Sequence, residues 1–70
     1  MHITYHAAQR FLERVIKKSR FDKSDIAKAK SFLKREFGSI LFPLNAKVPL
    51  PSLPFAKAVI KNGAVVTILV

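Results

Sequence analysis

The chain has 70 residues, of which 50% are hydrophobic, and it contains no cysteine. This length fits one small domain over residues 1–70, and the lack of cysteine excludes disulfides, thiolate metal sites and thiol nucleophiles. Thirteen Lys and Arg against four Asp and Glu give a net charge of +9. Such an excess favours nucleic acid, an anionic membrane or an acidic protein as partner, although it also fits a basic surface that binds nothing specific.

Apolar residues at helical spacing predict a first helix over about residues 4–18. A second helix is expected over 22–37, because Asp22 and Asp25 have the spacing of an N-cap residue and the acidic residue of a capping box. Gly38 is then expected to end this helix in the left-handed conformation.

The second half of the chain has a different composition. Residues 39–42 are compatible with a short strand, whereas the four prolines between 43 and 54 predict a loop that can be neither a helix nor a central strand. Residues 55–70 predict a hairpin around Asn62-Gly63, because both residues tolerate the positive φ of a type I′ turn. The expected fold is therefore α+β, with two N-terminal helices followed by a small antiparallel sheet in the order ααβββ.

If the strands pair regularly on both sides of a two-residue turn, Lys61 pairs with Ala64 and Ala58 pairs with Thr67. One face of the ribbon then carries Ala58, Ile60, Val65, Thr67 and Leu69, and the other carries Lys57, Val59, Lys61, Val66 and Ile68. Both faces are largely aliphatic, so the face away from the helices would need a cover. The proline-rich loop, a second copy of the chain in a homodimer, and another partner are all compatible with this pattern.

The first predicted helix has a basic side. On a helical wheel His6, Arg10, Arg14 and Lys17 fall on one side, nearly opposite the apolar stripe. Metal-independent RNA cleavage requires a proton acceptor for the 2′-hydroxyl and cations for the phosphate, and histidine and arginine suit these tasks. The alternative interpretation is a helix that shows basic residues to water.

The residues Thr4–Val15 resemble the opening helix, H-A-x-x-R-x-x-E-R, of a family of small bacterial and phage domains. That family is grouped with the BrnT- and RelE-type toxins, among the barnase–EndoU–colicin–RelE-like RNases that need no metal. Residues 59–69 resemble its closing hairpin. The resemblance implies an antiparallel sheet with helices on one face, a cleft for RNA, and an acidic antitoxin or immunity protein as partner. It matches His6, Arg10 and Arg14 to the helix motif and Thr67 to a polar position on the last strand, and these four are the catalytic candidates that the resemblance implies.

Other residues are candidates for nucleic-acid contacts. Lys17, Lys57 and Lys61 are candidates for phosphate binding, and Tyr5 for stacking on a base or donating a proton. Each also has an ordinary structural interpretation, as a solvated lysine or a packed tyrosine. His2 and His6 are four residues apart, so a helix could direct both at one metal ion, but no cysteine or nearby acid supplies a third ligand. No metal site or other cofactor is therefore expected.

Three functional hypotheses follow. The first is a metal-independent endoribonuclease of the toxin type, or an RNA-binding relative of one. The second is a non-catalytic basic module, of phage or bacterial origin, that binds nucleic acid or a host protein and blocks it. The third is an obligate homodimer whose sheet faces pair and whose function is structural only. A cytoplasmic location without a membrane partner is expected in each case, because the chain has no long apolar run and no secretory signal.

Overall fold

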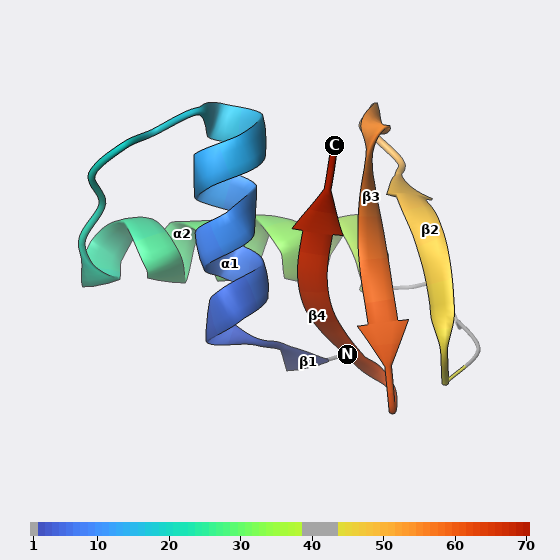
Figure 1. Cartoon of the computed structure of the whole chain (residues 1–70). Helices are drawn as coiled ribbons and strands as arrows, with labels where there is room; N and C mark the ends of the chain where they lie inside the picture. Colours follow the sequence, from blue (N-terminus) through green and yellow to red (C-terminus); the bar gives the residue numbers. More distant parts are fainter. Residues whose placement is uncertain (1, 39–43) are drawn as a thin grey trace.

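The computed structural model describes residues 2–38 and 44–70. The elements in chain order are β1 (His2–Ile3), α1 (Tyr5–Phe11), the π-helix η1 (Leu12–Ile16), α2 (Lys23–Phe37), β2 (Ala46–Leu50), β3 (Leu53–Lys61) and β4 (Ala64–Leu69) (Figure 1). The α+β class is confirmed. The order ααβββ is wrong in detail, because a short strand precedes the helices.

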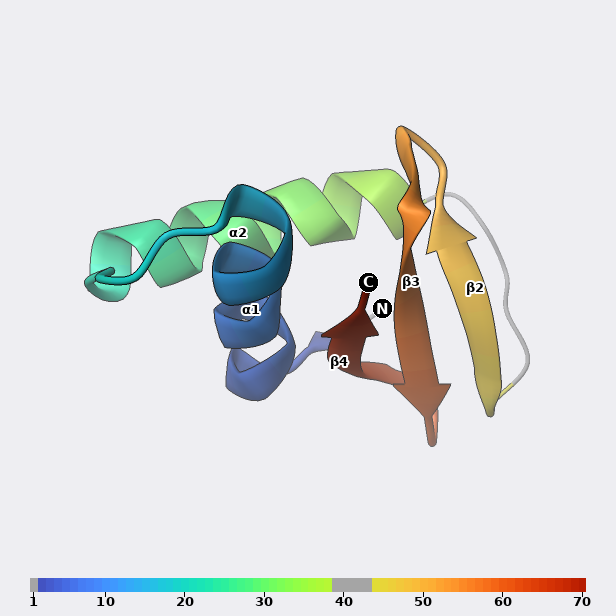
Figure 2. The ribbon, with the colours of Figure 1, turned by 45° about the horizontal axis from the view of Figure 1, so that its top comes forward.

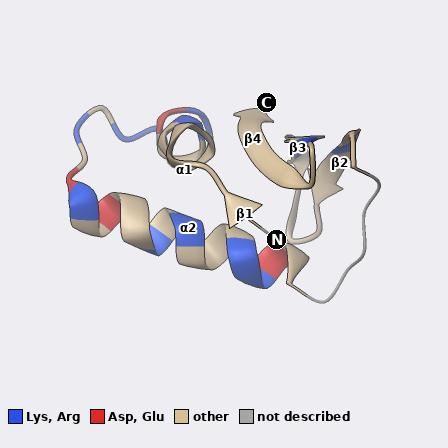
Figure 3. Cartoon of the chain, turned by 90° about the horizontal axis from the view of Figure 1, so that it is seen from below, with Lys and Arg blue, Asp and Glu red and all other residues tan. Residues whose placement is uncertain are grey.

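The sheet has four strands in the order β1-β4-β3-β2 and is mixed rather than antiparallel. The hairpin strands and β2 pair antiparallel, whereas β1 pairs parallel to β4 through His2 with Ala64 and Ile3 with Val65. Figure 3 shows α1 beside β4 in the layer of the sheet, with α2 running beneath both. Figure 2 shows the same crossing of the two helices from another direction. The helices therefore leave one face of the sheet uncovered.

The core lies between α1, α2 and the covered face of the sheet. Its largest fully buried side chains are Phe37, Ile3, Leu33, Leu50, Ile60, Ile68 and Val65. The rings of Phe11 and Phe32 stack across the two helices with 5.2 Å between their centroids. Burial of such residues contributes about 1.5–3 kcal/mol for each large side chain, which is the main force that holds α1 beside the sheet.

The first helical segment is slightly shorter than the predicted range of 4–18. Thr4 is its N-cap, with a side chain that accepts a hydrogen bond from the Ala7 N–H, and the segment ends at Ile16. Its last five residues form the π-helix, which is closed by a hydrogen bond from Lys18 N–H to the Leu12 carbonyl. Lys17 adopts the left-handed conformation at φ 62° and ends the segment.

The second helix confirms the predicted start. Asp22 accepts a hydrogen bond from the Asp25 N–H at 3.0 Å, and the Asp25 carboxylate accepts one from the Asp22 N–H at 3.1 Å. The left-handed conformation predicted for Gly38 is wrong, because its φ of −60° and ψ of −29° are right-handed. Glycine is required there by space, since a Cβ would lie 2.8 Å from the Lys34 carbonyl oxygen.

The loop predicted over 43–54 is partly wrong, because β2 lies inside it and β3 begins at Leu53. Pro49 is tolerated because β2 pairs only with β3 and so occupies the edge of the sheet. Pro54 lies in the central strand β3, contrary to the expectation, but in the part that precedes the pairing of β3 with β4, which begins at Lys57. The strand predicted over 39–42 lies outside the described residues.

The turn of the hairpin is confirmed, with Asn62 at φ 52° and Gly63 at φ 76°. The register is wrong beyond the second pair. Ile60 pairs with Val65, but Val59 pairs with Thr67, so Val66 is an extra residue in β4 and forms a β-bulge. The bulge turns Ile68 into the core and places Thr67 and Leu69 on the uncovered face with Val59 and Lys57.

Candidate functional site

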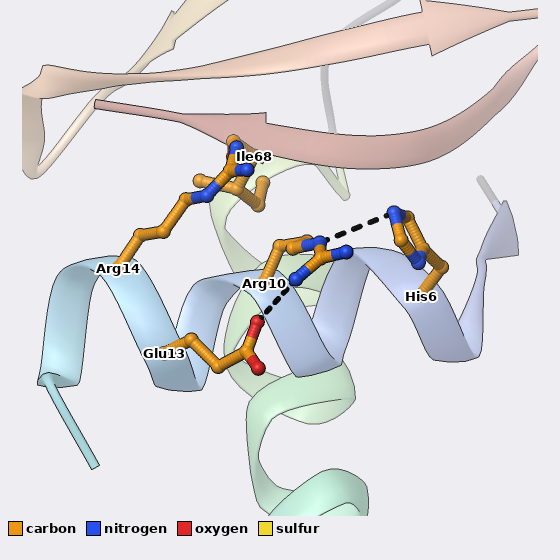
Figure 4. Close-up of polar contacts among 5 residues, drawn as sticks. All are labelled: His6, Arg10, Glu13, Arg14 and Ile68. Carbon is orange, nitrogen blue, oxygen red and sulfur yellow. Dashed lines mark hydrogen bonds and ion pairs between the residues drawn. The ribbon is translucent and has the colours of Figure 1, made fainter. Parts of the chain in front are cut away.

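The side chains of His6, Arg10 and Arg14 point from the same side of the first helical segment toward β4 (Figure 4). Their spacing of four residues places them on successive turns. We call the row formed by Thr4, His6, Arg10 and Arg14 along the edge of β4 the α1–β4 seam. The structure thus brings together the three residues that the helix motif assigns to catalysis.

His6 and Arg10 are in direct contact. Arg10 Nε donates a hydrogen bond to His6 Nε2 at 3.3 Å. An imidazole nitrogen accepts a hydrogen bond through its lone pair. A lone pair on Nε2 is also what a general base requires, and the guanidinium beside it suits a phosphate.

Arg10 has a second partner. Its Nη1 lies 2.7 Å from Glu13 Oε1 in an ion pair in which both side chains are about one-third exposed, 35% and 37%. Glu13 is part of the quoted helix motif, but it was not predicted as a site residue. Its i, i+3 spacing from Arg10 is the signal that could have identified it. The carboxylate offsets part of the charge that Arg10 would otherwise offer to a phosphate.

Arg14 is held by the sheet. Its Nη1 donates a hydrogen bond at 2.8 Å to the carbonyl oxygen of Ile68. Because β1 covers only the first two residues of β4, this carbonyl lies on a stretch of edge where β1 supplies no donor. Thr4 acts in the same way, since both its N–H and its hydroxyl donate to the Val65 carbonyl, at 3.1 and 3.0 Å. Arg14 therefore has a structural task in addition to any contact with a ligand.

Thr67 lies on β4 next to Ile68, but its strand partner is Val59, on the uncovered face of the sheet. Within the described part of the chain, no hydrogen bond joins Thr67 to the α1–β4 seam. The position that the resemblance assigns to catalysis is therefore near the row without contacting it.

The remaining predicted residues lie apart from the row. Tyr5 opens α1 and is 57% exposed, and Lys17 is the exposed C-cap of the π-helix. Lys57 and Lys61 are exposed on β3, on the uncovered face. Lys47 and Phe55 share that face, and sequence reasoning missed both of them, Lys47 because it falls within the range predicted to be a loop.

Two cavities lie outside the α1–β4 seam. The first, of about 450 Å³, is largely apolar and lies between the two helical segments and the β2–β3 turn, with Phe11, Phe32 and Leu53 among its walls. The second, of about 370 Å³, is on the uncovered face of the sheet and is lined by Lys47, Phe55, Lys57, Leu69 and Val70. Neither cavity is lined by His6, Arg10 or Arg14.

The negative charges gather on the helices. Asp22, Asp25 and Glu13 lie on helical segments or caps, and Glu36 accepts hydrogen bonds from the N–H and hydroxyl of Ser52. The pKa of Asp25 lies below its usual value, mainly because the Asp22 N–H donates to its carboxylate, with a smaller contribution from the ammonium of Lys18 at 3.3 Å.

The described residues contain no group of three or more His, Asp or Glu side chains arranged to hold a metal ion. His2 is on β1 and so does not share a helix with His6. In this same part of the chain, no helix has the length and apolar character needed to cross a bilayer.

No protein-family model matches this chain, and neither the curated proteins nor the solved structures contain a significant match. The resemblance to the toxin RNases therefore depends on the helix motif and hairpin alone.

Proposed function

We propose that this protein binds RNA and cleaves it without a metal ion, in the manner of the toxin-type RNases that its sequence resembles. The observation that supports this most strongly is the contact between His6 Nε2 and Arg10 Nε at 3.3 Å, on a side of α1 that the core does not use. An acidic antitoxin, immunity or host protein is the partner that such an activity and a net charge of +9 imply.

In the proposed reaction, Arg10 turns its Nε–H from His6 Nε2 to the phosphate, and the freed Nε2 takes the proton of a ribose 2′-hydroxyl. The 2′-oxygen then forms a bond to phosphorus as the bond from phosphorus to the 5′-oxygen breaks. Arg10 donates hydrogen bonds to the non-bridging oxygens, where negative charge builds up. The leaving 5′-oxygen takes a proton from the protonated imidazole or from water, and the products carry 2′,3′-cyclic phosphate and 5′-hydroxyl ends.

The test is incubation of the parent protein with end-labelled RNA in EDTA, followed by analysis of the product ends. His6→Ala is expected to lower the cleavage rate by about 100-fold or more, which is the usual contribution of a positioned acid or base. Arg10→Ala is expected to lower it as well. Arg20→Ala is the matched control, because it removes the same charge from the exposed segment between the helices. Cleavage that persists unchanged in His6→Ala would refute this mechanism.

The second candidate function is the non-catalytic basic module. It is favoured by a separate observation, namely that Glu13 already pairs with Arg10 and that the Ile68 carbonyl already holds Arg14. This function predicts binding of RNA without cleavage. Binding would survive His6→Ala and would weaken with salt and with each cation removed.

A further inference from the structure

The face of the sheet that the helices leave uncovered has a distinct composition. Alternation along β3 places Phe55, Lys57, Val59 and Lys61 on this face, because Ala56, Ala58 and Ile60 between them are buried. Lys47 of β2 pairs with Val59, and Leu69 of β4 pairs with Lys57. We call this surface the open sheet face.

The open sheet face is hollowed where Phe55, Lys57 and Leu69 meet Lys47 and Val70. The hollow has a volume of about 370 Å³, within the range of about 300–1,000 Å³ that is usual for small-ligand sites. Phe55 is 58% exposed, which is unusual for a phenylalanine, since large aromatic side chains are ordinarily buried. An exposed ring at the wall of a hollow is available for stacking.

The charged side chains of this face all have the same sign. The three strands β2, β3 and β4 contain Lys47, Lys57 and Lys61 and no acidic residue. None of the three lysines has an ion pair or hydrogen bond to another side chain among the described residues. Each ammonium can therefore donate to an incoming phosphate without first leaving a carboxylate.

We propose that the open sheet face binds single-stranded RNA, with one base stacked on Phe55 in the hollow and the flanking phosphates contacted by Lys47 and Lys57. This inference rests on the proposed function in taking RNA as the ligand, but it uses a different surface. In single-stranded RNA, each base is a flat ring that lies between two phosphates of the backbone. The hollow contains the ring of Phe55 together with one lysine on β3, Lys57, and one on β2, Lys47.

Two other occupants fit part of these features. An anionic membrane would be attracted by the lysines, but a lipid headgroup has no aromatic ring that could stack on Phe55 in the hollow. A second copy of the chain would bring three unpaired lysines against three identical ones, which is unfavourable for a dimer formed through this face. Charge complementarity and the hollow together favour a nucleic acid strand.

The test introduces a reporter at Phe55. The chain has no tryptophan, so Phe55→Trp gives it one indole, at the proposed stacking position. The probe is a 2′-O-methyl oligouridylate, which has no free 2′-hydroxyl and so resists cleavage. We expect saturable quenching of the Phe55→Trp fluorescence. Ile16→Trp, at a 53% exposed position in the wall of the other cavity, is the matched control and should be quenched little.

A second measurement uses the same oligonucleotide with a fluorescent label. Phe55→Ala should weaken its binding by about fivefold or more, because loss of an aromatic stacking partner has effects of that size. Lys57→Ala and Lys47→Ala should each lower the salt dependence of binding, by a little less than one unit in the log–log slope. Circular dichroism checks that these exposed substitutions leave the fold intact.

The outcomes separate this inference from the proposed function. If the oligonucleotide binds Phe55→Ala as tightly as the parent, and Phe55→Trp is not quenched, the inference is wrong, while cleavage of unmodified RNA still decides the function. Quenching with retained binding in His6→Ala supports the inference even if no RNA is cleaved. A fluorescence change that requires anionic vesicles, or that follows protein concentration without RNA, would assign the face to a membrane or a second copy and overturn the inference.

Discussion

The α1–β4 seam and the open sheet face are both basic, but they differ in what their charged groups contact. At the seam, Arg14 donates to the Ile68 carbonyl and Arg10 contacts both His6 and Glu13. On the open sheet face, Lys47 and Lys57 form no ion pair within the described part of the chain. Positive charge alone therefore does not identify a binding site. A cation with a partner in its own fold must release or share that contact before it binds a ligand, whereas a cation without a partner is available to a ligand directly.

The largest expected effect on stability comes from comparing two residues of β4, one in the core and one on the open sheet face. Ile68 is fully buried, so Ile68→Ala should lower the free energy of unfolding by about 3 kcal/mol. Leu69→Ala, on the uncovered side of the same strand, should lower it by about 1 kcal/mol or less. Urea unfolding followed by circular dichroism measures both. A larger loss in Leu69→Ala would mean that the bulge at Val66 is absent and that the regular register holds.

The next effect compares one cation from each region. Arg14→Ala should lower the free energy of unfolding by about 1–2 kcal/mol, because it leaves the part-buried Ile68 carbonyl without its donor. Lys57→Ala removes the same charge from an exposed position and should change stability by less than about 0.5 kcal/mol. Equal losses in the two variants would contradict the distinction between the seam and the open face.

A smaller effect, of opposite sign, is expected at Lys17, which is the C-cap of η1 and the last residue on the basic side predicted for the first helix. Its φ of 62° is unfavourable for a residue with a Cβ. Lys17→Gly should raise the free energy of unfolding by about 0.5–1 kcal/mol, since glycine adopts this conformation freely. Lys17→Ala removes the same charge but keeps the strain, so the difference between the two variants in thermal unfolding isolates the backbone contribution.

The smallest effect is a pH dependence at Asp25, far from the open face. Because its pKa is lowered in the folded state, the unfolded chain binds more protons than the folded chain as the pH falls toward the usual carboxylate pKa. Asp25 therefore contributes to stability at pH values above the usual carboxylate pKa of the unfolded chain. This contribution is lost as the pH falls through the lowered pKa of the folded chain. Asp25→Asn should lack this part of the acid dependence in urea unfolding between about pH 5 and 2. An unchanged pH profile would contradict the assignment.

Features that depend on neighbours in sequence were predictable. The capping box of Asp22 and Asp25 and the turn of Asn62 and Gly63 require only a few adjacent residues, and both are observed. The row of His6, Arg10 and Arg14 follows in the same way from helical spacing.

Features that depend on distant contacts were not predictable. The bulge at Val66 could not be predicted, because both faces of β4 are aliphatic and the hydrophobic pattern therefore does not determine the strand register. The Ile68 carbonyl that holds Arg14 is 54 residues away in sequence, and no local pattern indicates it. The hollow on the open face needs Lys47, which becomes a strand residue only because β3 supplies a partner for a proline-containing segment.

The proline in β2 has a consequence for self-association. An unpaired strand at the border of a sheet is a template on which further chains can add, which is how fibrils grow. Here one border is β2, which carries Pro49 and so lacks one backbone donor. The other border is the two-residue strand β1, and beside it Thr4 and Arg14 donate to the Val65 and Ile68 carbonyls on the edge of β4. Growth of the sheet by addition of strands is therefore disfavoured on both sides, and a concentrated preparation of this basic chain should resist amyloid formation.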